Sequence, residues 1–173
     1  MANSLPIAIK SAAAISVPCD LSSSSLKLQS PNNIIYARRF LSSLKNKIKH
    51  KSKLFPLWFD FTKYDQIKTI EDFDDWYTAP ANGFSSAQDY YAKNSSRFFL
   101  PYIIKPTLLL NSLDDPFLTN SCMPFIEARE NKYLLFSYTK KGGHVGFQSK
   151  KLFGVIHWHE KKIISFLTRN HLE

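Results

Sequence analysis

Three short apolar runs stand out along the chain, at residues 12–17, 107–111 and 133–138. Each is five or six residues long and is rich in aliphatic or aromatic side chains. Runs of this kind predict strands that are buried on both faces, as in a parallel sheet. Pro18 ends the first run, because proline cannot donate a hydrogen bond to a neighbouring strand. We therefore expect three parallel strands.

Apolar residues at helical spacing, with capping residues before them, predict helices elsewhere in the chain. The expected helices cover residues 32–49, 69–77, 84–94, 120–127 and 152–168. Thr69 is the expected N-cap of the second helix, with Asp72 at its third position, and Ser85 or Ser86 caps the third. No convincing buried strand lies between residues 21 and 101. This alternation of strands and helical segments predicts an α/β fold.

One predicted helix carries most of the net charge of +9. Between Arg38 and Lys53 there are seven lysines or arginines and His50, and no acidic residue. Apolar residues recur at helical spacing through residues 34–48, so the helix is amphipathic. We favour a solvated helix whose apolar stripe packs on the protein, and the alternative is contact with an anionic membrane surface. Nucleic acid is not an expected partner, because no helix-turn-helix, zinc or base-stacking pattern accompanies the charge.

Length and composition bound the class of protein. With 173 residues, 44% of them hydrophobic, the chain is long enough for one domain with a core. No apolar stretch approaches the ~20 residues that span a bilayer. The two cysteines, Cys19 and Cys122, match neither a disulfide framework nor a metal site, and His157 and His159 would face different sides of a helix. We expect a soluble, cytoplasmic protein with no metal and no cofactor.

Candidate chemistry follows two of the predicted strands. Asp114 and Asp115 come just after the second apolar run, and Gly142, Gly143 and His144 come after the third. The carboxyl ends of neighbouring parallel strands lie at one edge of the sheet, where open α/β sheets bind their ligands. An imidazole beside a carboxylate is a general base with a fixed tautomer. An acid followed by a histidine is also the chain order of the α/β-hydrolase triad, Ser…Asp…His.

Several stretches of the sequence, in order, are those of one family. They are residues 14–21, 69–75 with 78–84, 89–91, 110–117 and 142–147. Together they resemble the carboxyl-terminal half of the YheT-like branch of the α/β-hydrolase superfamily, which holds bacterial YheT esterases and eukaryotic ABHD-type lipases and esterases. The resemblance implies a partial α/β-hydrolase domain over residues 1–173, with about three parallel strands and flanking helices. It also implies that residues 21–101 are a helical cap inserted within that domain.

The same resemblance implies roles for two side chains. Alignment through the Asp-Asp-Pro stretch places the acid at Asp115 and the base at His144, and leaves Asp114 as a turn residue. Counting from the end of the strand alone would permit Asp114 as the acid, so this alternative stays open. The glycines before His144 allow positive φ angles and bring its ring close to a nucleophile. Asn82 stands where members of the family commonly have histidine.

A nucleophile is not found in the sequence. The Gly-x-Ser-x-Gly elbow of the superfamily does not occur, and nothing corresponds to the loop that forms the oxyanion hole. The serines at residues 22–25 lack flanking glycines. Cys19 also lacks a glycine frame and is better explained as a small buried thiol.

Two functions are consistent with these observations. In the first, the chain is a fragment of a serine carboxylesterase that acts on a small ester or lipid-like substrate, and an amino-terminal half supplies the serine. In the second, it is non-catalytic, either a remnant or a module that binds a membrane surface or a partner through the basic helix at residues 34–53. The acid and the histidine favour the first, in which the isolated chain is expected to be inactive as a serine hydrolase.

Overall fold

The computed structural model describes residues 8–55, 61–147 and 158–169. The chain divides into two compact units. Unit 1 combines Met1–Asp20 with Ser96–Glu173, and unit 2 is Leu21–Ser95. The segment expected to form a cap, residues 21–101, thus contains the whole of unit 2 and the first short helical turns of unit 1. Its role as a cap stays a prediction.

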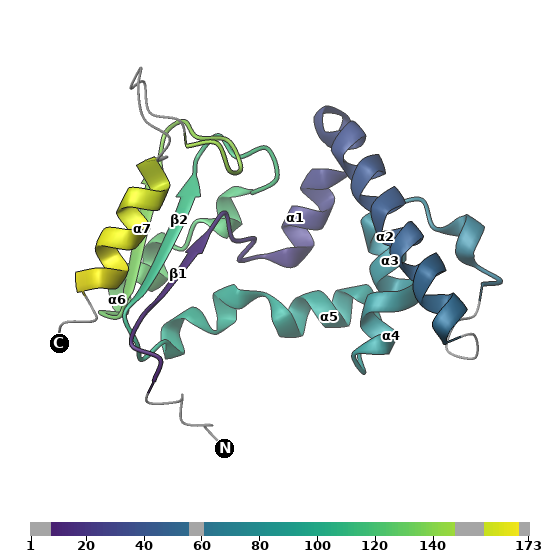
Figure 1. The fold of residues 1–173 in the computed structure, drawn as a ribbon, viewed down its shortest axis with the longest axis horizontal. Coiled ribbons are helices and arrows are strands. Elements are labelled where there is room, and N and C mark those ends of the chain that lie inside the picture. Colours follow the sequence, from purple (N-terminus) through teal and green to yellow (C-terminus); the bar gives the residue numbers. More distant parts are fainter. Residues whose placement is uncertain (1–7, 56–60, 148–157, 170–173) are drawn as a thin grey trace. The chain divides into compact units, whose positions relative to one another are not determined.

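Unit 1 contains a three-stranded parallel sheet (Figure 1). Its strands, in the order β1-β2-β3, are Ala12–Ile15, Thr107–Ser112 and Leu134–Thr139. The central strand β2 pairs through Leu109 with Ala14 of β1 and with Phe136 of β3. Parallel strands with flanking helices agree with the expected carboxyl-terminal half of an α/β-hydrolase fold.

The three strands are not equally buried. The aliphatic run of β2 is covered on both faces, with Leu108 and Leu110 fully buried. On β3, in contrast, Leu135 is 50% exposed and Tyr138 is 49% exposed. The expectation of burial on both faces is therefore correct for β2 and wrong for β3. It is also wrong for β1, in which Ala12 is exposed and the next three residues are half-buried. Both β1 and β3 are edge strands of the three-stranded sheet. In addition, helix α7 lies against β1 and β2, which leaves Leu135 of β3 uncovered.

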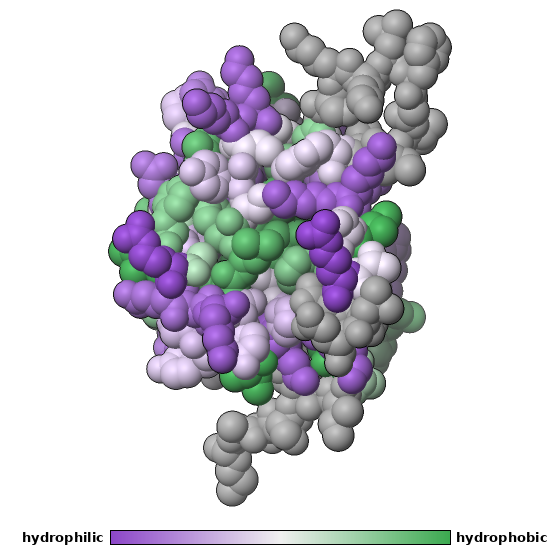
Figure 2. All heavy atoms as spheres, turned by 90° about the vertical axis from the view of Figure 1, so that its left-hand side faces the viewer, coloured by the Kyte–Doolittle hydropathy of each residue, from purple (hydrophilic) through white to green (hydrophobic). Residues whose placement is uncertain are grey.

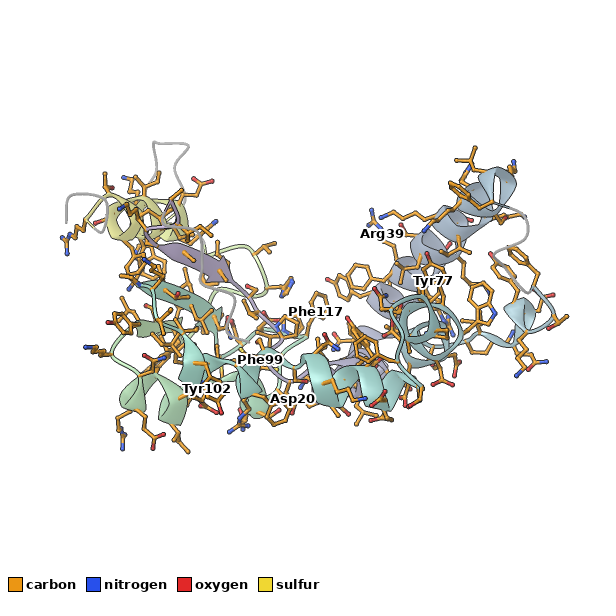
Figure 3. All side chains as sticks on the ribbon, turned by 90° about the horizontal axis from the view of Figure 1, so that it is seen from below. Asp20, Arg39, Tyr77, Phe99, Tyr102 and Phe117 are labelled. Carbon is orange, nitrogen blue, oxygen red and sulfur yellow. The ribbon has the colours of Figure 1, made fainter. Side chains whose placement is uncertain are left out.

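Helices cover both faces of this sheet. Helix α7 (Trp158–Arg169) lies on one face and α6 (Phe125–Glu130) on the other (Figures 1 and 3). On the α6 side, the ring of Phe125 meets Phe136 and Tyr138 of β3 edge-on. Apolar side chains gather on the surface seen from the α7 end of Figure 1 (Figure 2). The beginning expected for the last helix, residues 152–157, lies outside the described residues.

Shorter helical turns complete unit 1. They are the 3-10 helices η5 (Ser96–Phe98), η6 (Leu100–Tyr102) and η7 (Asn120–Cys122). The single helix expected over residues 120–127 is wrong, since η7 and α6 are separate. Pro124 separates them: it disfavours helical backbone at Met123, whose φ and ψ are −104° and 97°.

The described part of unit 2 is helical and holds no strand, as expected for this segment. Its α-helices are α1 (Leu21–Leu28), α2 (Ile34–Leu54), α3 (Ile70–Phe73), α4 (Ala79–Ala81) and α5 (Ala87–Asn94). The 3-10 helices η1 (Pro31–Asn33) and η3 (Tyr64–Gln66) and the π-helical turn η4 (Asp74–Thr78) connect them. The basic helix α2 runs five residues beyond its expected end, and Lys51 and Lys53 in its last turn suit the negative end of the helix dipole.

Two of the helix starts predicted from the sequence lie in unit 2. Thr69 accepts a hydrogen bond from the Asp72 N–H at 3.0 Å, and Asp72 accepts one from the Thr69 N–H at 2.9 Å. This reciprocal capping box confirms the predicted N-cap. Ser86 is the cap of α5, since it accepts from the Asp89 N–H, so the helix begins at Ala87 and not at residue 84.

A small apolar core holds α2 in unit 2. Its buried members are Leu41, Ile48, Ile67 and Phe73, of which the first two come from α2. The predicted apolar stripe of the basic helix therefore packs on the protein only in part: Leu41, Leu44 and Ile48 pack there. The other predicted stripe residues are exposed, and they are Ile34, Ile35 and Phe40. Among the described residues, no helix has both the length and the apolar character that a membrane crossing requires.

Candidate active site

The carboxyl ends of β2 and β3 bring the two predicted site residues together. Asp115 lies three residues beyond the end of β2, and His144 lies five residues beyond the end of β3. The strands are adjacent and parallel, so the loops that follow them meet at the same edge of the sheet. Both loops belong to unit 1.

A hydrogen bond joins the histidine to the second aspartate. His144 Nδ1 lies 2.8 Å from Asp115 Oδ2. The other carboxylate oxygen, Oδ1, accepts the Phe117 N–H at 2.8 Å. The Asp115 side chain is fully buried, whereas 36% of the His144 side chain is exposed. A carboxylate held at both oxygens fixes the orientation of the imidazole, and the imidazole remains accessible from solvent.

The first aspartate holds the loop that carries the histidine. Asp114 Oδ1 accepts the backbone N–H groups of Gly142, at 2.8 Å, and Gly143, at 2.9 Å. It also accepts the hydroxyl of Ser112 at 2.5 Å. The Ser112 hydroxyl and then the glycine N–H groups lower the pKa of the Asp114 carboxyl below its usual value. The structure therefore places Asp115 against the histidine ring and Asp114 against the backbone before it.

Gly142 and Gly143 suit their positions for different structural reasons. Gly143 has a φ of +60°, which L side chains rarely adopt, and a Cβ at this position would meet no atom within 4 Å. Gly142 does not have a positive φ, contrary to the expectation for both glycines. A Cβ there would lie 2.9 Å from the Phe147 side chain and 3.0 Å from the Ser112 hydroxyl. Gly142 thus allows close packing, and Gly143 allows the turn.

Two further residues contact the histidine and were not predicted. The ring of Phe117, labelled in Figure 3, meets the imidazole edge-on with centroids 4.8 Å apart. Ser16, which follows β1 with a φ of 52°, donates its hydroxyl to the backbone carbonyl of His144. Phe117 lies two residues after Asp115, so a turn predicted at this point of the sequence could have indicated its contact with the histidine. Nothing in the sequence distinguishes Ser16.

A buried asparagine fixes the end of the central strand. Asn111 is fully buried. Its Oδ1 accepts the Val17 N–H at 3.1 Å, and its Nδ2 donates to the Cys122 carbonyl at 3.1 Å. These bonds tie the segment after β1 to the helical turn after β2. An amide at the end of an aliphatic run is a signal of such an anchor, because buried polar groups need partners.

Among the described residues, the two cysteines and His159 do not extend the site. Cys19 is fully buried, and burial raises the pKa of its thiol, which keeps the sulfur protonated. Within the described residues, no cluster of three or more histidine, cysteine or acidic side chains could hold a metal ion. His159 is half-buried, with its ring 5.3 Å from that of Phe147. His157 and His171 lie outside the described residues.

Comparison with known proteins finds relatives along most of this chain. The "Putative esterase YheT" of Escherichia coli is 32% identical over 168 residues, which are 96% of this chain and 48% of that protein. "Phospholipase ABHD3" of Homo sapiens is 29% identical over 140 residues, which are 80% of this chain and 34% of that protein. "Medium-chain fatty acid ethyl ester synthase/esterase 2" of Saccharomyces cerevisiae is 36% identical over 107 residues, which are 62% of this chain and 23% of that protein.

The chain spans about half or less of the length of these curated relatives. No family model matches the sequence. No solved structure matches it. The match to the YheT esterase nevertheless covers nearly the whole chain, and the parallel sheet with flanking helices agrees with an α/β-hydrolase fold. The chain therefore belongs to the YheT/ABHD branch of the α/β-hydrolase superfamily.

Proposed function

We propose that this chain contributes the acid and the base of a Ser–His–Asp triad in a carboxylic-ester hydrolase. Asp115 is the acid and His144 is the base. The observation that carries the proposal is the 2.8 Å separation of His144 Nδ1 and Asp115 Oδ2 at the carboxyl edge of the sheet. The 173 residues contain no Gly-x-Ser-x-Gly. In this proposal the nucleophilic serine and the oxyanion-hole N–H groups come from residues outside the sequence.

The geometry of the pair fits the two proton transfers of such a hydrolase. When the Nδ1–H of His144 donates to Asp115, Nε2 is the acceptor nitrogen of the neutral ring. As the serine Oγ bonds to the ester carbonyl carbon, its proton passes to Nε2, and the Asp115 carboxylate stabilises the resulting imidazolium. The imidazolium then protonates the departing alcohol oxygen as the tetrahedral intermediate collapses to the acyl-enzyme. Water then attacks the acyl-enzyme in the same way, and His144 takes a proton from the water. The carboxylic acid is released as His144 returns a proton to the serine.

The proposed substrates are small or lipid-like carboxylic esters. This proposal is supported by the relatives, which by name include a putative esterase, a phospholipase and a fatty acid ethyl ester synthase/esterase. The buried carboxylate and the accessible imidazole favour no particular acyl chain. We also propose a cytoplasmic location, which the two buried cysteine thiols support.

The test compares the complete product of the native gene, with any protein that co-purifies, and the 173-residue chain. A fluorophosphonate probe should label a serine in the former and should not label the chain alone. In the complete product, His144→Ala should lower kcat for a p-nitrophenyl ester by about 10⁴-fold or more, and Asp115→Asn by about 10⁴-fold. The matched control is His159→Ala, which should retain activity.

Two results would contradict the proposal. Stoichiometric labelling of the isolated chain that is lost in His144→Ala would reveal a nucleophile within these residues. A complete gene product that hydrolyses no ester and takes no label would favour the non-catalytic alternative, in which the basic helix binds a surface or a partner.

A further inference from the structure

Helix α2 holds nearly all of the excess positive charge. It carries seven of the 23 lysines and arginines and no acidic residue. The remaining sixteen basic residues are nearly balanced by the fourteen acidic residues of the chain. The basic character of the protein is therefore a property of this one helix, and it needs an explanation beyond the proposed triad.

One side of α2 is used to hold unit 2 together. Leu41 and Ile48 are buried there. Two of the lysines also serve the fold: Lys45 Nζ donates to the Tyr64 carbonyl at 2.8 Å, and Lys51 Nζ contacts the Tyr77 hydroxyl at 2.9 Å. These side chains are therefore already engaged within unit 2.

The opposite side of α2 is exposed and cationic. Successive residues of an α-helix are about 100° apart around its axis. By this rule, the centre of one group of five residues lies about 180° around the helix from the buried Leu41 and Ile48. The five are Ile35, Arg39, His50, Lys53 and Leu54. These five residues are all exposed. A further three exposed basic residues flank them, Arg38, Lys47 and Lys49. Within the described part of the chain, none of the lysines and arginines on this side forms an ion pair with a carboxylate.

Aliphatic side chains lie at both ends of this cationic side. Ile35 is 77% exposed in the first turn of α2, and Leu54 is 75% exposed at its last residue. They are about 28 Å apart along the axis, with Arg39, which projects from the helix in Figure 3, on the surface between them. Nucleic acid would match the charge but would leave both aliphatic groups in water. An anionic lipid surface would accept both the charge and the aliphatic groups.

We propose that the exposed side of α2 docks on an anionic phospholipid bilayer. The helix lies flat on the surface, with its lysines and arginines among the lipid phosphates and with Ile35 and Leu54 in the headgroup layer. Basic residues next to an anionic leaflet add their attractions, and an exposed aliphatic residue at each end fixes the helix parallel to the surface. This docking does not depend on the proposed triad, since it uses residues of unit 2 alone.

Vesicle flotation of the 173-residue chain tests the proposal. Flotation separates lipid-bound protein, which rises, from aggregated protein, which sinks. The chain should rise with vesicles of phosphatidylcholine mixed with phosphatidylglycerol, should not rise with phosphatidylcholine alone, and should be released as salt is raised. Equal flotation with the two kinds of vesicle would overturn the proposal, as would binding to a duplex DNA probe without any flotation.

Matched variants locate the docking surface. Arg39→Glu/Lys47→Glu/Lys53→Glu should weaken binding to anionic vesicles by at least about 100-fold, because each basic side chain contributes about fivefold near such a surface. The control, Lys10→Glu/Lys132→Glu/Lys161→Glu, makes the same change in net charge at exposed lysines of unit 1 and should have a much smaller effect. An equal loss in both triple variants would show that net charge, and not α2, is responsible.

A second variant separates the aliphatic contribution from the charge. Ile35→Ser/Leu54→Ser leaves every charge in place and changes two side chains that are mostly exposed. It should weaken flotation with anionic vesicles and leave the dependence on salt unchanged. Circular dichroism of each variant checks that the helices are retained. Full binding by the double serine variant would overturn the flat placement of the helix.

Discussion

Asp114 and Gly143 are joined by a hydrogen bond across 29 residues of sequence, in which the Gly143 N–H donates to Asp114 Oδ1 at 2.9 Å. The neighbouring Asp115 instead contacts the imidazole of His144. Two adjacent carboxylates therefore hold different parts of one loop. Asp114 holds the backbone of the loop, and Asp115 holds the imidazole of His144.

We predict that replacing Asp114 releases the histidine loop. Asp114→Ala removes the acceptor of the Gly142 and Gly143 N–H groups, so both amides should exchange faster with solvent. Asp114→Asn keeps a carbonyl oxygen that can accept and should retain part of the protection. Amide exchange measured by NMR distinguishes the two variants. Equal protection in wild type and Asp114→Ala would contradict the anchoring role.

The hydrogen bonds from the Gly142 and Gly143 N–H groups to Asp114 should weaken at low pH. The pKa of Asp114 is lowered, first by the Ser112 hydroxyl and then by the glycine N–H groups, so the folded state favours the carboxylate. The stabilisation is thus present above the ordinary aspartate pKa of about 3.9 and is lost as the pH falls through the lowered value. The Gly142 and Gly143 amide shifts should titrate below pH ~4, and should not do so in Asp114→Asn.

Substitutions at the two glycines should have different outcomes. Gly143→Asn should be nearly neutral, because asparagine adopts positive φ more readily than other side chains and a Cβ has open space there. Gly142→Ala should destabilise the protein by about 1–3 kcal/mol, since its Cβ would press on Phe147 and on the Ser112 hydroxyl. Urea unfolding of both variants gives the comparison. A larger loss at Gly143 would contradict it.

Local patterns predicted much of this fold and its candidate site. The aliphatic run of β2 and the order of acid and histidine are read from neighbouring residues, and parallel pairing then brings Asp115 to His144. The exposure of Leu135 could not be predicted, because it depends on which strands α7 covers. The Ser16 bond to the His144 backbone likewise joins residues 128 apart, and a serine there has no distinctive pattern. The break at Pro124, in contrast, was predictable from proline alone.

The unequal burial of the strands predicts unequal responses to the same substitution. Leu110→Ala on β2 should lower the free energy of unfolding by about 2–5 kcal/mol, because the leucine is fully buried and its removal leaves a cavity. Leu135→Ala on β3 should lower it by about 1 kcal/mol or less, because half of that side chain is already in solvent. Denaturant melts of the two variants test the difference, and similar losses would show that Leu135 is covered in solution.

The outer edge of β1 should make the isolated chain self-associate. β1 pairs with β2 on one side, and no strand of the described residues pairs with its other side. Its four residues, Ala12–Ile15, are all apolar, and an apolar strand with unpaired backbone groups is a template for another strand. Ala12→Lys should reduce the association, because lysine on an edge strand discourages pairing. Ser165→Lys adds the same charge on α7 and is the matched control. Sedimentation velocity measures the outcome, and a monodisperse wild-type monomer with a cooperative thermal melt would show that the edge is covered.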